Sequence, residues 1–130
     1  MGRVVTILLV EDNEDDALFF RMGLRKSCAR VVHVADVESA IVYLETRPLP
    51  DLIVTDLMLP GMPVNRLLDW IRSSQSAREV PIVIHTGSEQ VPEAVRAAAR
   101  VIFFKASGLK ENRVTALQIL QVADPIRPTV

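Results

Sequence analysis

The sequence is poor in the residues that build disulfides and zinc sites. Its 130 residues include one cysteine, Cys28, and two histidines. A single cysteine excludes an internal disulfide framework, and the two histidines give no Cys/His spacing typical of zinc. This cysteine usage favours a reducing compartment, so we expect the protein in the cytoplasm.

Long apolar runs and a strong charge imbalance are also missing. The apolar stretches are long enough for strands only, and Glu11 and Asp12 interrupt the first of them, so we expect neither a membrane span nor a signal peptide. Fifteen basic and sixteen acidic residues leave a net charge of −1. That balance predicts no general attraction to nucleic acid or to an anionic membrane surface.

Length and composition predict one globular domain. The chain is 49% hydrophobic and 24% charged, with 5 glycines and 8 prolines, which are ordinary values. We expect a single domain over residues 1–130, with a core at about 4–123 and a tail at 124–130. Too few residues follow Ala123 for an output domain, so we expect a stand-alone protein, unless the chain is one domain excised from a longer one.

Two periodicities alternate along the chain. Apolar runs of strand length occur at Val4–Val10, Val31–Val34, Leu52–Thr55, Ile82–Ile84 and Val101–Phe104. Between them, apolar residues recur at the spacing i, i+3, i+4 and i+7, which marks one face of a helix. These faces are Val37, Ala40, Ile41 and Leu44; Val64, Leu67, Leu68 and Ile71; Val91, Ala94, Val95 and Ala98; and Ala116, Ile119, Leu120 and Ala123.

A less regular helix is expected at about Glu14 to Lys26. Its expected core residues are Ala17, Leu18, Phe20 and Leu24. Asn13 can cap this helix, and Pro63 and Pro92 suit the first position of the third and fourth helices.

This alternation predicts an α/β fold of the doubly wound type. Five strands alternating with five helices imply a five-stranded parallel sheet covered on both faces. With right-handed crossovers, one common strand order is 2-1-3-4-5. Functional sites in such sheets lie at the carboxyl ends of the strands, near the point where strand order reverses.

Polar residues stand at four of the predicted strand ends. The first strand ends in Glu11 and Asp12, the third in Asp56, the fourth in Thr86 and the fifth in Lys105. Two carboxylates about 4 Å apart repel by roughly 4 kcal/mol at an effective dielectric constant near 20, so this cluster must bind a cation or raise a pKa. All-oxygen ligands suit Mg²⁺.

The same set of residues suits phosphoryl transfer. Lys105 offers a point charge for a phosphoryl group and Thr86 offers a hydrogen bond, while Asp56 can act as the nucleophile and form an aspartyl phosphate. Other phosphate-handling sites fail on motif: there is no P-loop, no glycine-rich dinucleotide turn and no G-x-S-x-G elbow. A phosphatase with an acid two residues after its nucleophile fits badly, because Met58 occupies that place.

At these residues the sequence resembles a known family. The segments ILLVEDNEDD, DLIVTDLMLPGM, PIVIHTGS and VIFFK are similar to the receiver domain of two-component response regulators, the CheY-like fold. The similarity covers about Val4 to Ala123, and the wording VEDNEDD is most similar to stand-alone receivers paired with phytochrome-type kinases.

The resemblance implies a role for each site residue. Asp56 would be the phosphoacceptor, and Glu11, Asp12 and Asp56 would hold Mg²⁺ together with the backbone carbonyl of Met58. Thr86 would supply the hydroxyl that follows the phosphoryl group, and Lys105 the ammonium that pairs with it. Such a protein is a phosphoacceptor rather than a turnover enzyme.

The implied partners are proteins. A sensor histidine kinase or a histidine phosphotransfer protein would donate the phosphoryl group, and a downstream protein would bind the switched surface or take the phosphoryl group onward. The resemblance also allows a homodimer through the face made by the fourth helix, the fifth strand and the fifth helix. No nucleic acid and no membrane is implied.

The sequence departs from the family pattern in four ways. Ala106 replaces the proline that usually follows the lysine, and we predict a trans peptide there because a cis bond without proline costs about 2.5–4 kcal/mol. Ile102 stands where an aromatic residue usually reports phosphorylation, with Phe104 at the same strand parity. Pro63-Val64 replaces the usual Asp-Gly, and Gly87 follows Thr86 where alanine is common.

These departures keep two other hypotheses open. One is a receiver-like module that binds proteins without being phosphorylated, favoured by Ala106, Ile102 and Val64. The other is a small Mg²⁺-dependent phosphohydrolase, which would turn over small phosphoesters.

Several other polar residues have plainer interpretations. We expect Asp15 and Asp16 to be solvated residues of a first helical turn. His85 should point away from the crevice as a hydrogen-bonded core histidine, because adjacent strand residues face opposite sides. His33 is expected within or at the edge of a strand, and Trp70 partly packed.

Overall fold

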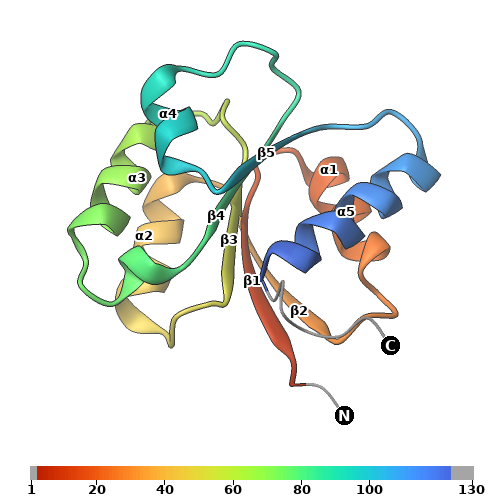
Figure 1. Cartoon of the computed structure of the whole chain (residues 1–130), viewed down its shortest axis with the longest axis horizontal. Helices are drawn as coiled ribbons and strands as arrows, with labels where there is room; N and C mark the ends of the chain where they lie inside the picture. Colours follow the sequence, from red (N-terminus) through yellow and green to blue (C-terminus); the bar gives the residue numbers. More distant parts are fainter. Residues whose placement is uncertain (1–2, 124–130) are drawn as a thin grey trace.

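One parallel sheet with strands in the order β2-β1-β3-β4-β5 organises the molecule (Figure 1). The computed structural model describes residues 3–123. Both the α/β class and the strand order predicted from the sequence are confirmed. The expected tail at 124–130 lies outside the described residues.

Eleven elements follow one another along the described chain. The strands are β1 (Val5–Val10), β2 (Ala29–Val34), β3 (Leu52–Thr55), β4 (Ile82–Thr86) and β5 (Val101–Phe104). The helices are α1 (Glu14–Gly23), α2 (Val37–Thr46), α3 (Val64–Ser73), a 3-10 turn η1 (Ala77–Glu79), α4 (Glu93–Ala98) and α5 (Leu109–Ala123).

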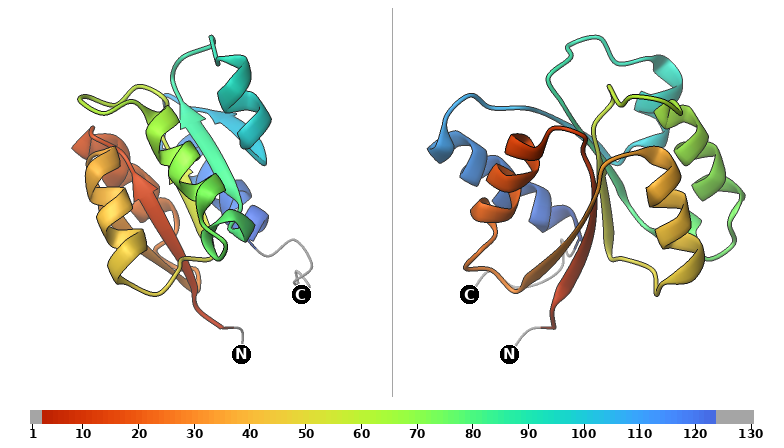
Figure 2. Two further views of the ribbon diagram at one scale, coloured as in Figure 1. Left: turned by 90° about the vertical axis from the view of Figure 1, so that its left-hand side faces the viewer. Right: turned by 180° about the vertical axis from the view of Figure 1, so that it is seen from behind.

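Helices cover the sheet on both faces, as Figures 1 and 2 show from three directions. One core lies under α2, α3 and α4 and includes Leu8, Ile53 and Ile84. The other lies under α1 and α5 and includes Leu9 and Val54. Neighbouring residues of one strand therefore belong to opposite cores, which is why the central strands read as continuous apolar runs.

Most of the predicted helical faces are buried. The face of α3, which comprises Val64, Leu67, Leu68 and Ile71, is buried completely. In α1 the prediction was right for Ala17, Phe20 and Leu24 and wrong for Leu18, which is 44% exposed. Leu18 follows Ala17 directly, so the helical rotation that buries Ala17 turns Leu18 outward.

Three predicted helix boundaries are corrected. The first helix ends at Gly23 rather than Lys26, because the backbone then closes short turns, with Arg25 N–H donating to Met22 O at 3.3 Å. Pro63 and Pro92 lie just before their helices, with extended backbone (ψ 153° and 149°), instead of in the first helical position. Each can still end the preceding loop, since the proline ring fixes φ but leaves ψ free to be extended.

Strand boundaries also move by a few residues. Val4 lies outside β1 and is exposed, while β2 begins earlier, at Ala29. β4 continues to Thr86, two residues beyond its predicted end, because it pairs with β5 as far as Phe104. Of the described helices, none is both long and apolar enough to span a bilayer.

The strand order places the first and third strand ends next to each other. β1 pairs with β3 in a register that sets Val10 opposite Thr55. The ladder continues one step further, because Asp56 N–H donates to Val10 O at 3.0 Å. The residues that follow these two strands, Glu11 and Asp56, are therefore neighbours by the geometry of the sheet.

Candidate functional site

The predicted strand-end residues meet at the carboxyl edge of the sheet. Glu11 follows β1, Asp56 follows β3 and Lys105 follows β5. Glu11 is only 3% exposed and Asp56 6%, although both carry carboxylates. Buried carboxylates are costly unless they are paired or bind a cation, so this edge is a chemical site rather than a solvated loop.

An acidic cluster forms one half of the site. Glu11, Asp12 and Asp56 each offer a carboxylate oxygen, and these oxygens all lie within 4.8 Å of one another. Asp12 is exposed, whereas its two partners are buried. An all-oxygen set that is open to water on one side matches the ligands Mg²⁺ takes in proteins, where it keeps several waters.

Lys105 forms the other half and contacts three carboxylates. Its Nζ lies 2.7 Å from Asp16 Oδ2, 2.7 Å from Asp56 Oδ2 and 2.9 Å from Glu11 Oε1. Burial works against the charged amine, but the hydrogen bonds from Asp16, Asp56 and Glu11 outweigh it and raise the pKa of Lys105 above its ordinary value. The Lys105 amine is therefore protonated at neutral pH.

Asp16 was missed by the sequence interpretation. We expected a solvated residue of a first helical turn, and its carboxylate instead binds the ammonium of Lys105. The available signal was its place in the first turn of the helix that follows Glu11 and Asp12. Which residue of that turn faces the strand ends depends on the rotation of α1 against the sheet, and sequence spacing alone does not fix that rotation.

The carboxylate of Asp56 is held on both sides. Its Oδ1 accepts hydrogen bonds from the backbone N–H groups of Leu57 at 2.6 Å and Met58 at 3.3 Å. Its Oδ2 faces Lys105. The group that could act as a nucleophile is thus fixed in orientation by its own loop and by the lysine.

The turn after β1 is held by Glu11. Glu11 Oε2 accepts from Asn13 N–H at 3.1 Å, and Glu11 O lies 2.7 Å from His33 Nε2 on the edge strand β2. Burial raises the pKa of Glu11, and the hydrogen bonds from Lys105 and Asn13 oppose that effect only in part. His33 lies within a strand at the sheet edge, as predicted, and also supports this turn.

Thr86 lies buried at the end of β4. Its Oγ1 accepts a hydrogen bond from Ser88 N–H at 3.1 Å, which closes the turn after the strand. Because the acceptor side of the oxygen is used in this way, the hydroxyl proton is free to be donated elsewhere.

His85 lies beneath the site on the side of α1 and α5. Its ring is 7% exposed and tilted against Phe20, with ring centroids 6.1 Å apart. The core position was predicted correctly, but the expected hydrogen bonding was wrong for Nε2, which has no partner among the described residues. Burial, and next the charge of Lys105, lower the pKa of His85 to about 4.

The departures from the family pattern have structural outcomes. The described chain contains no cis peptide, so the trans peptide predicted before Ala106 is confirmed. Ile102 packs on the core under α2, α3 and α4, while Phe104 at the same parity is 51% exposed. Trp70 is partly buried against the same core, as expected.

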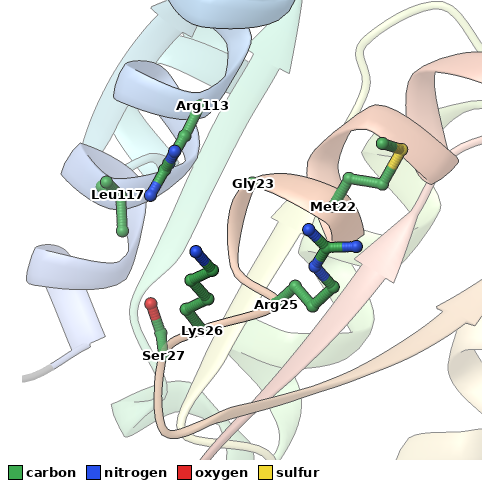
Figure 3. A pocket seen from close by; sticks show the side chains of 7 residues that line it. All are labelled: Met22, Gly23, Arg25, Lys26, Ser27, Arg113 and Leu117. Carbon is green, nitrogen blue, oxygen red and sulfur yellow. The ribbon is translucent and has the colours of Figure 1, made fainter.

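One cavity lined by described residues lies away from this site. It is a surface hollow of about 100 Å³ between the end of α1 and the face of α5 (Figure 3). It is lined by Met22, Gly23, Arg25, Lys26, Ser27, Arg113 and Leu117. No residue of the strand-end cluster belongs to it.

Comparison with known protein families matches this geometry. The model of the response regulator receiver domain matches residues 7–118. Two-component response regulator ORR8 of Oryza sativa subsp. japonica is 31% identical over 90 residues, which cover 69% of this chain and 74% of that protein. Probable methanogenesis regulatory protein FilR2 of Methanothrix harundinacea is 33% identical over 101 residues, covering 70% and 63%.

Solved structures agree with these sequence matches. The phosphorylated cyanobacterial phytochrome response regulator RcpA superposes with a TM-score of 0.82 at 25% identity, covering 96% of this chain and 97% of RcpA. The Mn²⁺-bound form of response regulator Rcp1 gives a TM-score of 0.80 at 24% identity, covering 97% and 99%, which is a likeness of fold. With the family model matched over most of its length, the chain belongs to the response regulator receiver domains of two-component signalling.

Proposed function

We propose that Asp56 accepts a phosphoryl group from a phosphohistidine of a sensor histidine kinase or a histidine phosphotransfer protein. The observation that carries this proposal is the buried Asp56 carboxylate, which belongs to the acidic cluster and also contacts the Lys105 ammonium at 2.7 Å. In the step, a bond forms between an Asp56 oxygen and phosphorus while the phosphorus–nitrogen bond breaks. The electron pair of that bond stays on the imidazole nitrogen, which then takes a proton from solvent.

The acidic cluster fits a Mg²⁺ ion as the cofactor. The carboxylates of Glu11, Asp12 and Asp56 would hold it, together with the backbone carbonyl of Met58. Bound there, the ion would neutralise negative charge on the phosphoryl oxygens. The support is the all-oxygen donor set and its convergence within 4.8 Å.

Lys105 and the loop after β3 prepare Asp56 for attack. The N–H groups of Leu57 and Met58 hold one carboxylate oxygen, so the carboxylate does not rotate freely. The Lys105 ammonium lies on the other oxygen and is positioned to pair with a phosphoryl oxygen once the new bond has formed.

Thr86 would couple the phosphoryl group to the surface. Its hydroxyl oxygen accepts from Ser88, so its proton can be donated to a phosphoryl oxygen. Moving Thr86 toward that oxygen would pull on the Ser88 turn and change the loop that leads to α4.

The product of this switch would be a changed protein-binding surface. We propose that a downstream protein reads the face of α4, β5 and α5, where Phe104 is exposed, and that a second copy of the chain is an alternative occupant. The modification would be one covalent event per molecule rather than turnover, and the setting would be the cytoplasm.

A mass measurement tests the proposal. We expect incubation with phosphoramidate and Mg²⁺ to add one phosphoryl group to the intact protein, and excess chelator to abolish the adduct. Asp56→Asn should remove it completely. Asp69→Asn, an equal charge change at an exposed position of α3, should leave it intact.

Other outcomes would favour the rival functions. Continuous release of phosphate from small phosphoesters would indicate a phosphohydrolase. A wild-type protein that forms neither the adduct nor a beryllofluoride complex would be a protein-binding module that works without phosphorylation.

A further inference from the structure

The ammonium of Lys105 has one carboxylate partner that belongs to no other part of the site. A lysine ammonium has three N–H donors, and here Asp16, Asp56 and Glu11 take them. Asp56 and Glu11 are also members of the acidic cluster, whereas Asp16 is not. Asp16 comes from a different element, the first turn of α1, 89 positions from Lys105 in sequence.

Asp56 and Glu11, which Lys105 shares with the acidic cluster, have other partners during phosphoryl transfer. This step rests on the proposed function: a cation held by Glu11 and Asp56 draws on the same two carboxylates that face Lys105, and Asp56 loses its charge at the oxygen that binds phosphorus. The cation also repels the ammonium. Asp16 is then the partner that still attracts Lys105 with a full negative charge.

The position of Asp16 is itself fixed by local structure. Asn13 caps α1, and its Oδ1 accepts from the backbone N–H of Asp16 at 2.9 Å. The Asp16 side chain is 37% exposed, and its Oδ2 lies 2.7 Å from Lys105 Nζ. Asp15, one residue earlier, is exposed on α1. A helix turns about 100° per residue, so these two acids serve different sides of the helix.

We propose that Asp16 is a positioning residue that holds the Lys105 ammonium over Asp56 during phosphoryl transfer. It does not touch the reacting atoms. It anchors the lysine from α1, so that the positive charge lies where the phosphoryl oxygens will be rather than swinging outward from the cation site. The position of the ammonium matters because displacing a catalytic group by about 1 Å can lower the rate on the order of a hundredfold.

The test compares two substitutions that each remove one negative charge from the first turn of α1. At saturating Mg²⁺, Asp16→Asn should slow phosphorylation by phosphoramidate by about tenfold or more. Asp15→Asn should stay within about twofold, although it removes the same charge from the same helix end. Asp16→Glu, which keeps the charge, should recover part of the rate. Thermal unfolding of each variant distinguishes a loss of folding from a displaced Lys105 ammonium.

A double-variant cycle distinguishes action through Lys105 from any other effect. In a Lys105→Met background, Asp16→Asn should cause no further loss of rate, because its target is gone. A full additional loss there, or an Asp16→Asn rate equal to that of Asp15→Asn, would overturn the inference and leave the proposed function standing. A wild-type protein that forms neither the phosphoryl adduct nor a beryllofluoride complex would overturn both.

Discussion

At the scale of single residues, the site is a balance between one buried ammonium and several carboxylates. Three acids converge on Lys105, and their hydrogen bonds raise its pKa although burial alone would lower it. Glu11 shows the opposite balance, since burial raises its pKa more than its partners lower it. One lysine therefore neutralises only part of the negative charge at this edge. The excess negative charge is what suits this edge to the proposed divalent cation.

His85 carries a stability penalty that depends on pH. Its pKa in the folded protein is about 4, against an ordinary value of 6.5. Between these two pH values His85 is protonated in the unfolded chain but neutral in the folded protein, so the free energy of unfolding falls as pH decreases. From pH 7 to pH 5 we expect His85 to account for a loss of about 2 kcal/mol.

Urea unfolding of the wild type and of His85→Phe at pH 7 and pH 5 measures this contribution. The variant should lose less stability over that interval, because every other titrating group is common to both proteins. At pH 7 it should be equally stable or more stable, since it removes a buried ring nitrogen that has no partner. Equal losses in the two proteins would show that His85 keeps an ordinary pKa.

At the scale of elements, α1 and α5 touch through a glycine. A Cβ placed on Gly23 would lie 3.0 Å from Ala116 Cβ and 3.2 Å from Arg113 Cα. The second of these neighbours is backbone, which cannot move aside as a flexible side chain would. Gly23 therefore sets the close approach of α1 and α5, the two helices that cover one face of the sheet. Residues of both helices line the cavity in Figure 3.

We expect Gly23→Ala to destabilise the protein. Overpacking costs about 1–3 kcal/mol, and the better helix propensity of alanine returns up to about 1 kcal/mol. The expected net loss is therefore about 1 kcal/mol in the free energy of unfolding, measured by urea titration. The matched control is Gly87→Ala, where an added Cβ meets nothing within 4 Å and the change should stay within about 0.5 kcal/mol. A more stable Gly23→Ala would mean that the helices separate at no cost.

Elements also show how far sequence patterns reach. Alternating apolar runs and helical faces were enough to predict all five strands and the helices between them, while the order of the sheet was predicted from the orders common among doubly wound folds. Their ends were less predictable, because the closing turns depend on backbone hydrogen bonds such as that from Arg25 to Met22. The exposure of Leu18 had the same origin: both it and Ala17 are apolar, and only the docked helix decides which of them faces the core.

At the scale of the whole molecule, the proposed cation site joins separate parts of the fold. Glu11 and Asp12 follow β1, and Asp56 follows β3, so a cation bound between them links two strand ends. An unfolded chain cannot bring these groups together. Binding to the folded state alone must therefore stabilise the entire domain.

We expect Mg²⁺ to raise the unfolding temperature. The gain in free energy of unfolding should reach about 2.7 kcal/mol when the Mg²⁺ concentration is a hundredfold above its Kd. Asp12→Asn should reduce the gain, and because Asp12 is exposed the variant should fold normally without the ion. NaCl at equal ionic strength serves as the control. A shift that sodium reproduces, or that Asp12→Asn leaves unchanged, would contradict a specific cation site.

The sequence by itself determined the class of fold and the identity of the strand-end residues, whereas the strand order needed a topology rule common to doubly wound sheets. It could do so because apolar periodicity and residue type are local properties of the chain. Tertiary structure decided how those residues are partnered. Asp16 reaches Lys105, and His85 is buried with Nε2 unpaired, because of how α1 is rotated and seated against the ends of the strands. Such contacts join residues far apart in sequence, and their geometry arises only when helices and sheet pack together.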